Sequence, residues 1–151
     1  MIDSIDLARH ILTVLREKEI DMFSGNTKLN KLLYIIYGLY IATTGESILN
    51  EKPKCFPYGP VFPKVFKKYD DLIQMTPMKL NIEDNDLKDS IEATINYFGD
   101  WSASRLSRWS HKEGSPWYKV FNGSDANYGK DLNDEDIKKY FKDNVLENNP
   151  S

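Results

Sequence analysis

The segment from residue 54 to residue 69 constrains the fold of this chain most, because it concentrates three prolines, a glycine and several aromatic side chains. Each proline fixes its own φ angle and biases the residue before it away from helix. We therefore expect Phe56 and Tyr58 to be extended and Tyr58, Gly59 and Pro60 to form a defined turn. So stiff a loop either packs under the core as a strap, the more common case in a short domain, or presents a fixed surface to a partner.

Composition places the chain in a broad class. Its 151 residues, 40% of them hydrophobic, are enough for one core, so we expect a single domain. A formal net charge of −3 lacks the basic excess that nucleic-acid binding needs, and direct contact with nucleic acid is not expected. No signal segment and no membrane-length apolar run occur, which predicts a cytoplasmic protein without membrane contact. The lone Cys55 excludes an internal disulfide.

Apolar residues recur at helical spacing along the chain. The expected helices cover residues 4–18, 27–44, 63–74, 87–98, 102–110 and 134–145, with one further short turn at 117–121. Thr27 is placed for the N-cap of the second helix, Gly45 for its left-handed C-cap, and Asn133 for the N-cap of the last helix. The second helix is apolar on nearly all sides, so it should be central, with the strap packed against it. The sequence thus predicts a mainly α, compact single-domain bundle of about six helices with a proline-rich loop and room for one short strand pair near residues 48–56.

Few residues could carry catalysis or hold a metal. Cys55 or a serine would need a histidine base that a carboxylate orients, and no motif supplies that set. His10 lies in a helix among apolar and charged neighbours, and His111 is better explained as the C-terminal residue of the fifth helix. One cysteine and two distant histidines have no metal-ligand spacing, and no glycine-rich phosphate loop occurs. We expect no catalytic residue, no metal and no cofactor.

Basic and aromatic residues gather near two loops of this acidic chain. The candidates for partner binding are Phe62, Lys64 and Lys67 near the proline-rich loop, and Arg105, Arg108, His111 and Trp117 near the fifth helix. Aromatic residues and arginine dominate binding energies at protein interfaces. If the two loops meet, these residues form a face suited to an acidic protein; lysine stems that cover the edges of the core are the alternative. Rings that prove fully buried would belong to the core instead.

Four motif groups follow one another along the chain. They are KLNKLLY at 28–34 with Gly38 and Tyr40; Tyr58, Gly59, Pro60 and Val61 with Pro63; Ser110 and His111 with Gly114, Ser115, Pro116 and Trp117; and LNDEDI at 132–137. Their order and spacing resemble the Panacea domain family, which includes the SocA-like antitoxins and the GepA-type phage-associated proteins. The resemblance assigns residues 1–146 to a Panacea-like domain and residues 147–151 to a polar tail. It implies a mainly structural role for Tyr58, Gly59, Pro60, Val61, Pro63, His111 and Trp117.

The resemblance also implies a function. It indicates an antitoxin that neutralises a toxin encoded beside it by direct contact. One type of family member acts as an adaptor that delivers its toxin to an AAA+ protease; this alternative stays open, because both roles begin with the same binding event. An enzyme that uses Cys55 or His111 is a distant third. The toxins of the family are chemically diverse, so the resemblance leaves the identity of the toxin open.

Overall fold

The computed structural model describes residues 1–146, and the expected tail at 147–151 lies outside the described residues. Within residues 1–146 the chain forms seven α-helices, one two-stranded sheet, a 3-10 turn and a π-helical turn. The elements in chain order are α1 (Ser4–Glu17), α2 (Gly25–Thr44), β1 (Lys54–Phe56), β2 (Gly59–Val61), α3 (Pro63–Leu72), α4 (Asn85–Phe98), α5 (Ala103–Ser110), α6 (Pro116–Phe121), η1 (Asp125–Asn127), α7 (Asp134–Phe141) and η2 (Lys142–Leu146). The predicted mainly α fold with one short strand pair is confirmed.

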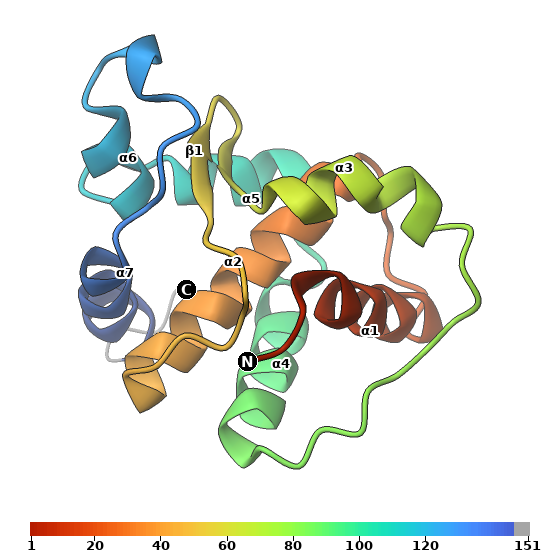
Figure 1. Ribbon diagram of the computed structural model, residues 1–151. Helices are drawn as coiled ribbons and strands as arrows, with labels where there is room; N and C mark the ends of the chain where they lie inside the picture. The colour runs from red at the N-terminus through yellow and green to blue at the C-terminus, as the bar shows by residue number, and fades with distance from the viewer. Residues whose placement is uncertain (147–151) are drawn as a thin grey trace.

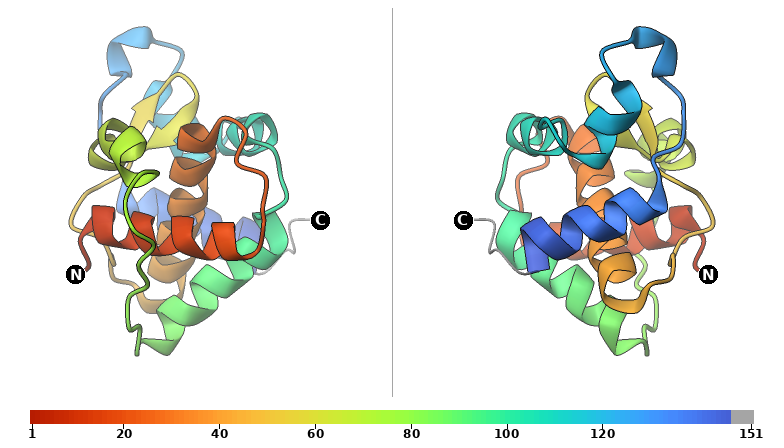
Figure 2. Two further views of the ribbon diagram at one scale, coloured as in Figure 1. Left: turned by 90° about the vertical axis from the view of Figure 1, so that its right-hand side faces the viewer. Right: turned by 90° about the vertical axis from the view of Figure 1, so that its left-hand side faces the viewer.

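The long helix α2 lies at the centre of the molecule, as predicted (Figure 1). Helices α1, α3, α4, α5 and α7 all pack against it. Figure 2 shows α1 and α7 crossing α2 on opposite sides. Every residue from Lys28 to Ala42 is buried, which explains why this helix has almost no polar stripe. No helix in the described part of the chain is long and apolar enough to cross a membrane.

The two ends of α2 differ in how well the sequence predicts them. At the C-terminus Gly45 has a φ of 81° and its N–H bonds to the carbonyl of Ile41, so the predicted left-handed cap is confirmed. At the N-terminus the expected Thr27 cap is wrong, because the N-cap residue is Ser24 and the helix begins at Gly25. A Cβ atom at Gly25 would overlap the hydroxyl of Tyr69 on α3. This start therefore depends on packing between helices, which local spacing does not reveal.

The proline-rich loop folds into an antiparallel hairpin in which Lys54 pairs with Val61, Cys55 with Pro60 and Phe56 with Gly59. The strand partner therefore lies at residues 59–61, outside the expected region at 48–56. Gly59 and Pro60 belong to a strand rather than to the turn we expected, and the turn itself is at residues 57–58. The N–H of Cys55 donates to the carbonyl oxygen of residue 130, and its own carbonyl accepts from the N–H of residue 129. Both groups therefore bond away from strand β2. Pro60 can consequently occupy the opposite strand position without an N–H.

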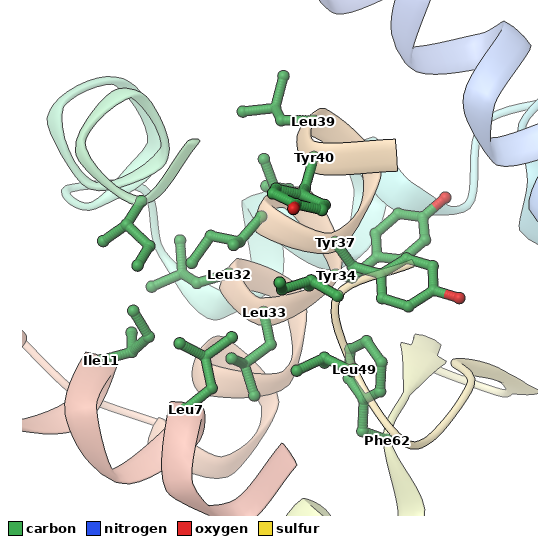
Figure 3. Packing of buried hydrophobic residues seen from close by; sticks show 14 of the residues in the cluster. Leu7, Ile11, Leu32, Leu33, Tyr34, Tyr37, Leu39, Tyr40, Leu49 and Phe62 are labelled. Atoms are coloured by element: carbon green, nitrogen blue, oxygen red, sulfur yellow. The ribbon is translucent and has the colours of Figure 1, made fainter. Parts of the chain in front are cut away.

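The hydrophobic core lies along both sides of α2. Figure 3 shows Leu7 and Ile11 of α1 pointing toward Leu32 and Leu33 of α2. On the side of the hairpin, the ring of Phe62 packs against Tyr37 with 5.7 Å between the centroids. The start of α3 and the hairpin are thus continuous with the core.

Candidate partner-binding surface

The hairpin is held from one side by residues that follow α5. Nε2 of His111 donates to the carbonyl oxygen of Pro57 at 2.6 Å, and Nε1 of Trp117 donates to that of Phe56 at 2.7 Å. The two rings also contact each other edge to face, with 4.5 Å between the centroids. The two loops that we considered separately in the sequence therefore meet.

Helix α2 holds the hairpin from below through a buried lysine. Nζ of Lys31 donates to the carbonyl oxygen of Pro60 at 2.9 Å, and only 1% of this residue is exposed. Loss of hydration on burial lowers the pKa of Lys31 to about 7. One helical position earlier, Oδ1 of Asn30 accepts from the N–H of Phe62 at 2.9 Å. The KLNKLLY motif includes both residues, but sequence reasoning assigned neither of them a contact with the hairpin.

Gly59 is the point of closest approach between the hairpin and the helices. Its φ of 109° is one that side chains tolerate poorly. A Cβ atom at this position would lie 2.4 Å from Oγ of Ser110 on α5 and 2.8 Å from Cε of Lys31. This geometry favours the strap interpretation for the backbone of the hairpin.

Three of the residues singled out from the sequence are placed differently from what we expected. Phe62 is fully buried and Trp117 is 5% exposed, so both rings belong to the core, the alternative that we gave for buried rings. Their burial follows from the contacts with Tyr37 and with the hairpin carbonyl. Tyr58, which we expected to be structural, is 71% exposed at the tip of the hairpin.

The basic candidates lie on two separate helices. Lys64 and Lys67 are exposed on α3, whereas Arg105 and Arg108 are exposed on α5. Figure 2 shows α3 and α5 on opposite sides of α2, so the single basic face that we expected is replaced by two groups that flank the hairpin.

Each arginine of α5 contacts a side chain in its own helix or just before the helix begins. The guanidinium of Arg105 lies 3.5 Å from the ring centroid of Trp101. Nη1 of Arg108 donates to Oγ of Ser104 at 2.7 Å. Neither these arginines nor the lysines of α3 make an ion pair within residues 1–146.

An apolar depression of about 270 Å³ lies between the hairpin and α3. We call it the hairpin groove, and its walls are formed by Phe56, Pro57, Tyr58, Val61, Pro63, Phe66 and Lys67. Phe66 on α3 is 48% exposed and forms one wall of this groove. The core side of α3 is instead taken by Val65 and Leu72. Sequence reasoning thus missed the groove.

The residues considered for catalysis lie in unfavourable surroundings for it. Cys55 is fully buried, and this burial raises the pKa of its thiol to about 11, the opposite of what a nucleophilic thiolate needs. Nδ1 of His10 accepts from the N–H of Leu80 at 2.9 Å, a structural contact. Within the described residues no three His, Cys, Asp or Glu side chains are grouped so as to hold a metal ion.

The described residues thus form a small helical fold with a hairpin fixed to its core and an exposed apolar groove, and comparison with known proteins identifies its family. The family model for the antitoxin SocA-like Panacea domain matches residues 29–118, and the chain belongs to this family. It is 30% identical over 158 residues to the antitoxin SocA of Caulobacter vibrioides (strain NA1000 / CB15N), a match that covers 92% of this chain and 84% of that protein. No solved structure gives a significant match. The family resemblance stated from the sequence motifs is confirmed.

Proposed function

We propose that this chain is an antitoxin that neutralises a cognate toxin by direct protein–protein contact through the surface around the hairpin. Its family supports the antitoxin role. The observation that carries direct contact is the combination of exposed rings, Tyr58 and Phe66, with the unpaired lysines of α3 on a backbone that the core holds rigidly. Exposed aromatic rings on a rigid backbone bind with little loss of conformational entropy.

Co-expression with the protein encoded next to this chain tests the proposal. The wild-type chain should restore growth and co-purify with that protein. A triple variant, Lys67→Ala, Arg105→Ala and Arg108→Ala, should lose both properties, because it removes cations from both sides of the hairpin. Circular dichroism must first show that the variant is folded.

A matched control removes three exposed lysines on other helices or helix ends: Lys18→Ala, Lys88→Ala and Lys142→Ala. This control should rescue growth as the wild type does. If the first triple variant still rescues and still co-purifies, the basic residues are only a solvated surface. The acidic first turn of α7 would then be the next candidate.

The same cells distinguish sequestration from delivery to an AAA+ protease. Under sequestration, the half-life of the toxin after synthesis stops should be unchanged or longer when the antitoxin is present. Under delivery, the half-life should fall, and the fall should vanish in cells that lack the protease. An immunoblot time course measures both.

Neutralisation by contact also predicts that no side chain of this protein acts as a nucleophile. Cys55→Ser should therefore rescue growth as the wild type does once thermal unfolding has shown that the buried substitution is tolerated. Loss of rescue by a folded Cys55→Ser variant would instead favour a thiol-dependent enzyme.

A further inference from the structure

We infer that the hairpin groove holds a large apolar side chain that the toxin presents from an acidic segment. This inference rests on the proposed function and adds the chemistry of the partner. It follows from four observations: the size of the groove, the rigidity of its walls, the positive charge of its rim on α3, and the ion pairs that neutralise the lysines at the start of the hairpin.

The groove has the size and lining for one apolar anchor. Its volume of about 270 Å³ is below the range of roughly 300–1,000 Å³ that is typical of small-ligand and cofactor pockets. Its walls are entirely apolar, so Lys67 contributes the methylene stem of its side chain while its ammonium remains at the rim. With no polar group inside to orient a ligand, the groove suits an aliphatic or aromatic side chain of another protein.

The walls are fixed before any partner arrives. The backbone around the groove is held by side chains that donate to its carbonyls, namely Trp117 to Phe56, His111 to Pro57, Lys31 to Pro60 and Asn26 to Phe66. Prolines 57 and 63 further restrict the two sides. A preformed apolar pocket costs little conformational entropy to fill.

The rim of the groove on α3 is positively charged. Lys64, Lys67 and Lys68 are exposed on this helix without ion pairs among the described residues, and Lys67 lines the groove. The acidic pair Asp70 and Asp71 falls near the end of the helix, beyond the groove residues.

The carboxylate of Glu51 contacts the start of α3 through the backbone and forms no ion pair with the lysines of that helix. Glu51 accepts from Oγ of Ser4 at 2.7 Å and from the N–H of Lys64 at 3.1 Å. The ammonium groups at the rim can therefore form ion pairs only with carboxylates of the partner.

The lysines at the start of the hairpin and just before it, in contrast, form ion pairs. Lys52 is paired with Asp134, and Lys54 with Asp131. The cations beside the groove that lack an ion pair among the described residues are thus those of α3, and an acidic segment that lies along α3 brings its apolar residue over the groove.

Affinity measurements with the full chain test the anchor. The probe is the purified product of the adjacent gene, immobilised, to which folded variants bind from solution. Phe66→Ala should weaken binding by about 30-fold or more, as truncation at the centre of an interface does. Lys67→Glu should weaken it by a similar factor, because it sets a carboxylate against the acidic segment of the partner. Raising the salt concentration from about 0.05 M to about 0.5 M should weaken wild-type binding more than binding of Lys67→Glu.

Matched controls remove an exposed ring and a lysine from other elements. Tyr118→Ala on α6 removes a ring that is 38% exposed, and Lys18→Glu reverses a charge at the end of α1. Both should bind within about threefold of the wild type, as surface changes outside an interface do.

A cross-linking experiment identifies what occupies the groove. Tyr58→p-benzoylphenylalanine places a photoreactive ring at the groove, and the same substitution at Tyr118 is the control. We expect cross-linking only from position 58, to a toxin peptide that contains an apolar residue beside Asp or Glu. Capture of a basic peptide or of a second copy of this chain would overturn the inference.

The outcomes separate the inference from the function on which it rests. If the wild-type chain neither binds the toxin nor rescues growth, the proposed function fails and the inference fails with it. If the wild type binds and rescues while Phe66→Ala and Lys67→Glu behave identically to it, the antitoxin function stands and the groove is not its binding site.

Discussion

The ammonium group of Lys31 lies 2.9 Å from the carbonyl oxygen of Pro60, inside the protein, and forms no ion pair with a carboxylate of the described chain. A lysine in such surroundings loses hydration that one carbonyl only partly replaces. The contact joins the first half of α2 to strand β2, so the protonation state of one side chain is linked to the position of the hairpin.

This burial predicts that the free energy of unfolding rises with pH between about pH 7 and pH 9. The pKa of Lys31 is about 7 in the folded protein and near its usual 10.5 when unfolded, so the unfolded chain binds more protons in this window. The slope should approach, but not exceed, about 1.4 kcal/mol per pH unit. Above pH 9 the raised pKa of Cys55 acts in the opposite direction, because the unfolded chain then releases its thiol proton first.

Denaturant unfolding of the wild type and Lys31→Met at pH 7, 8 and 9 measures this slope. Met has a similar shape and no titration, so its curve should be nearly flat in the window. Equal slopes for the two proteins would show that Lys31 is hydrated in solution.

A larger residue in place of Gly59 should destabilise the protein through both backbone strain and steric overlap with neighbouring side chains. Gly59→Val forces a branched side chain into a positive φ and against Ser110 and Lys31, which should destabilise the protein by on the order of 3 kcal/mol. Gly123→Val is the matched control, since its φ is 75° and no atom lies within 4 Å of its Cβ position. It should cost only the backbone strain, about 1–2 kcal/mol. Equal unfolding midpoints for the two variants would mean that the hairpin moves freely away from the helices.

Gly38, in the middle of α2, should not tolerate alanine. A Cβ atom there would lie 2.3–2.5 Å from ring atoms of Phe141. Gly38→Ala should therefore destabilise the protein by about 1–3 kcal/mol, although alanine is the better helix former by about 1 kcal/mol. In the background of Phe141→Leu the same substitution should cost less, and a double-mutant cycle by thermal unfolding measures the coupling. A stabilising Gly38→Ala substitution would contradict the close packing of α7 on α2.

Acid sensitivity should depend on the contact between Tyr40 and Asp84. The hydroxyl of Tyr40 donates to Oδ2 of Asp84 at 2.6 Å, while Oδ1 caps the start of α4. The hydrogen bond from Tyr40 lowers the pKa of this carboxyl, so its stabilising effect is present above the usual pKa of aspartate and is lost as the pH falls. Tyr40→Phe should make the free energy of unfolding less steeply dependent on pH below pH 4. Acid titrations of the wild type and Tyr40→Phe, followed by circular dichroism, measure the two slopes. Identical slopes would show that the contact is absent in solution.

Several features could be predicted from the sequence because they depend on residues within one helical turn. Asn133 caps α7 by accepting from the N–H of Asp136, and Gly45 ends α2, both as expected. The motifs also identified the family, since they record residue order rather than contacts.

The tertiary structure alone decided which side chains are available to a partner. Phe62 and Phe66 are four residues apart beside the same loop, yet one is buried against α2 and the other lines an open groove. Which of them faces the core depends on contacts with Tyr37 and Asn30, residues far away in the sequence. The same is true of Lys31, whose position inside the protein follows from the hairpin that covers it. Sequence periodicity determines that a short helix has an apolar side. When the apolar surface of the chain is larger than the core can cover, only packing decides which apolar residues remain exposed.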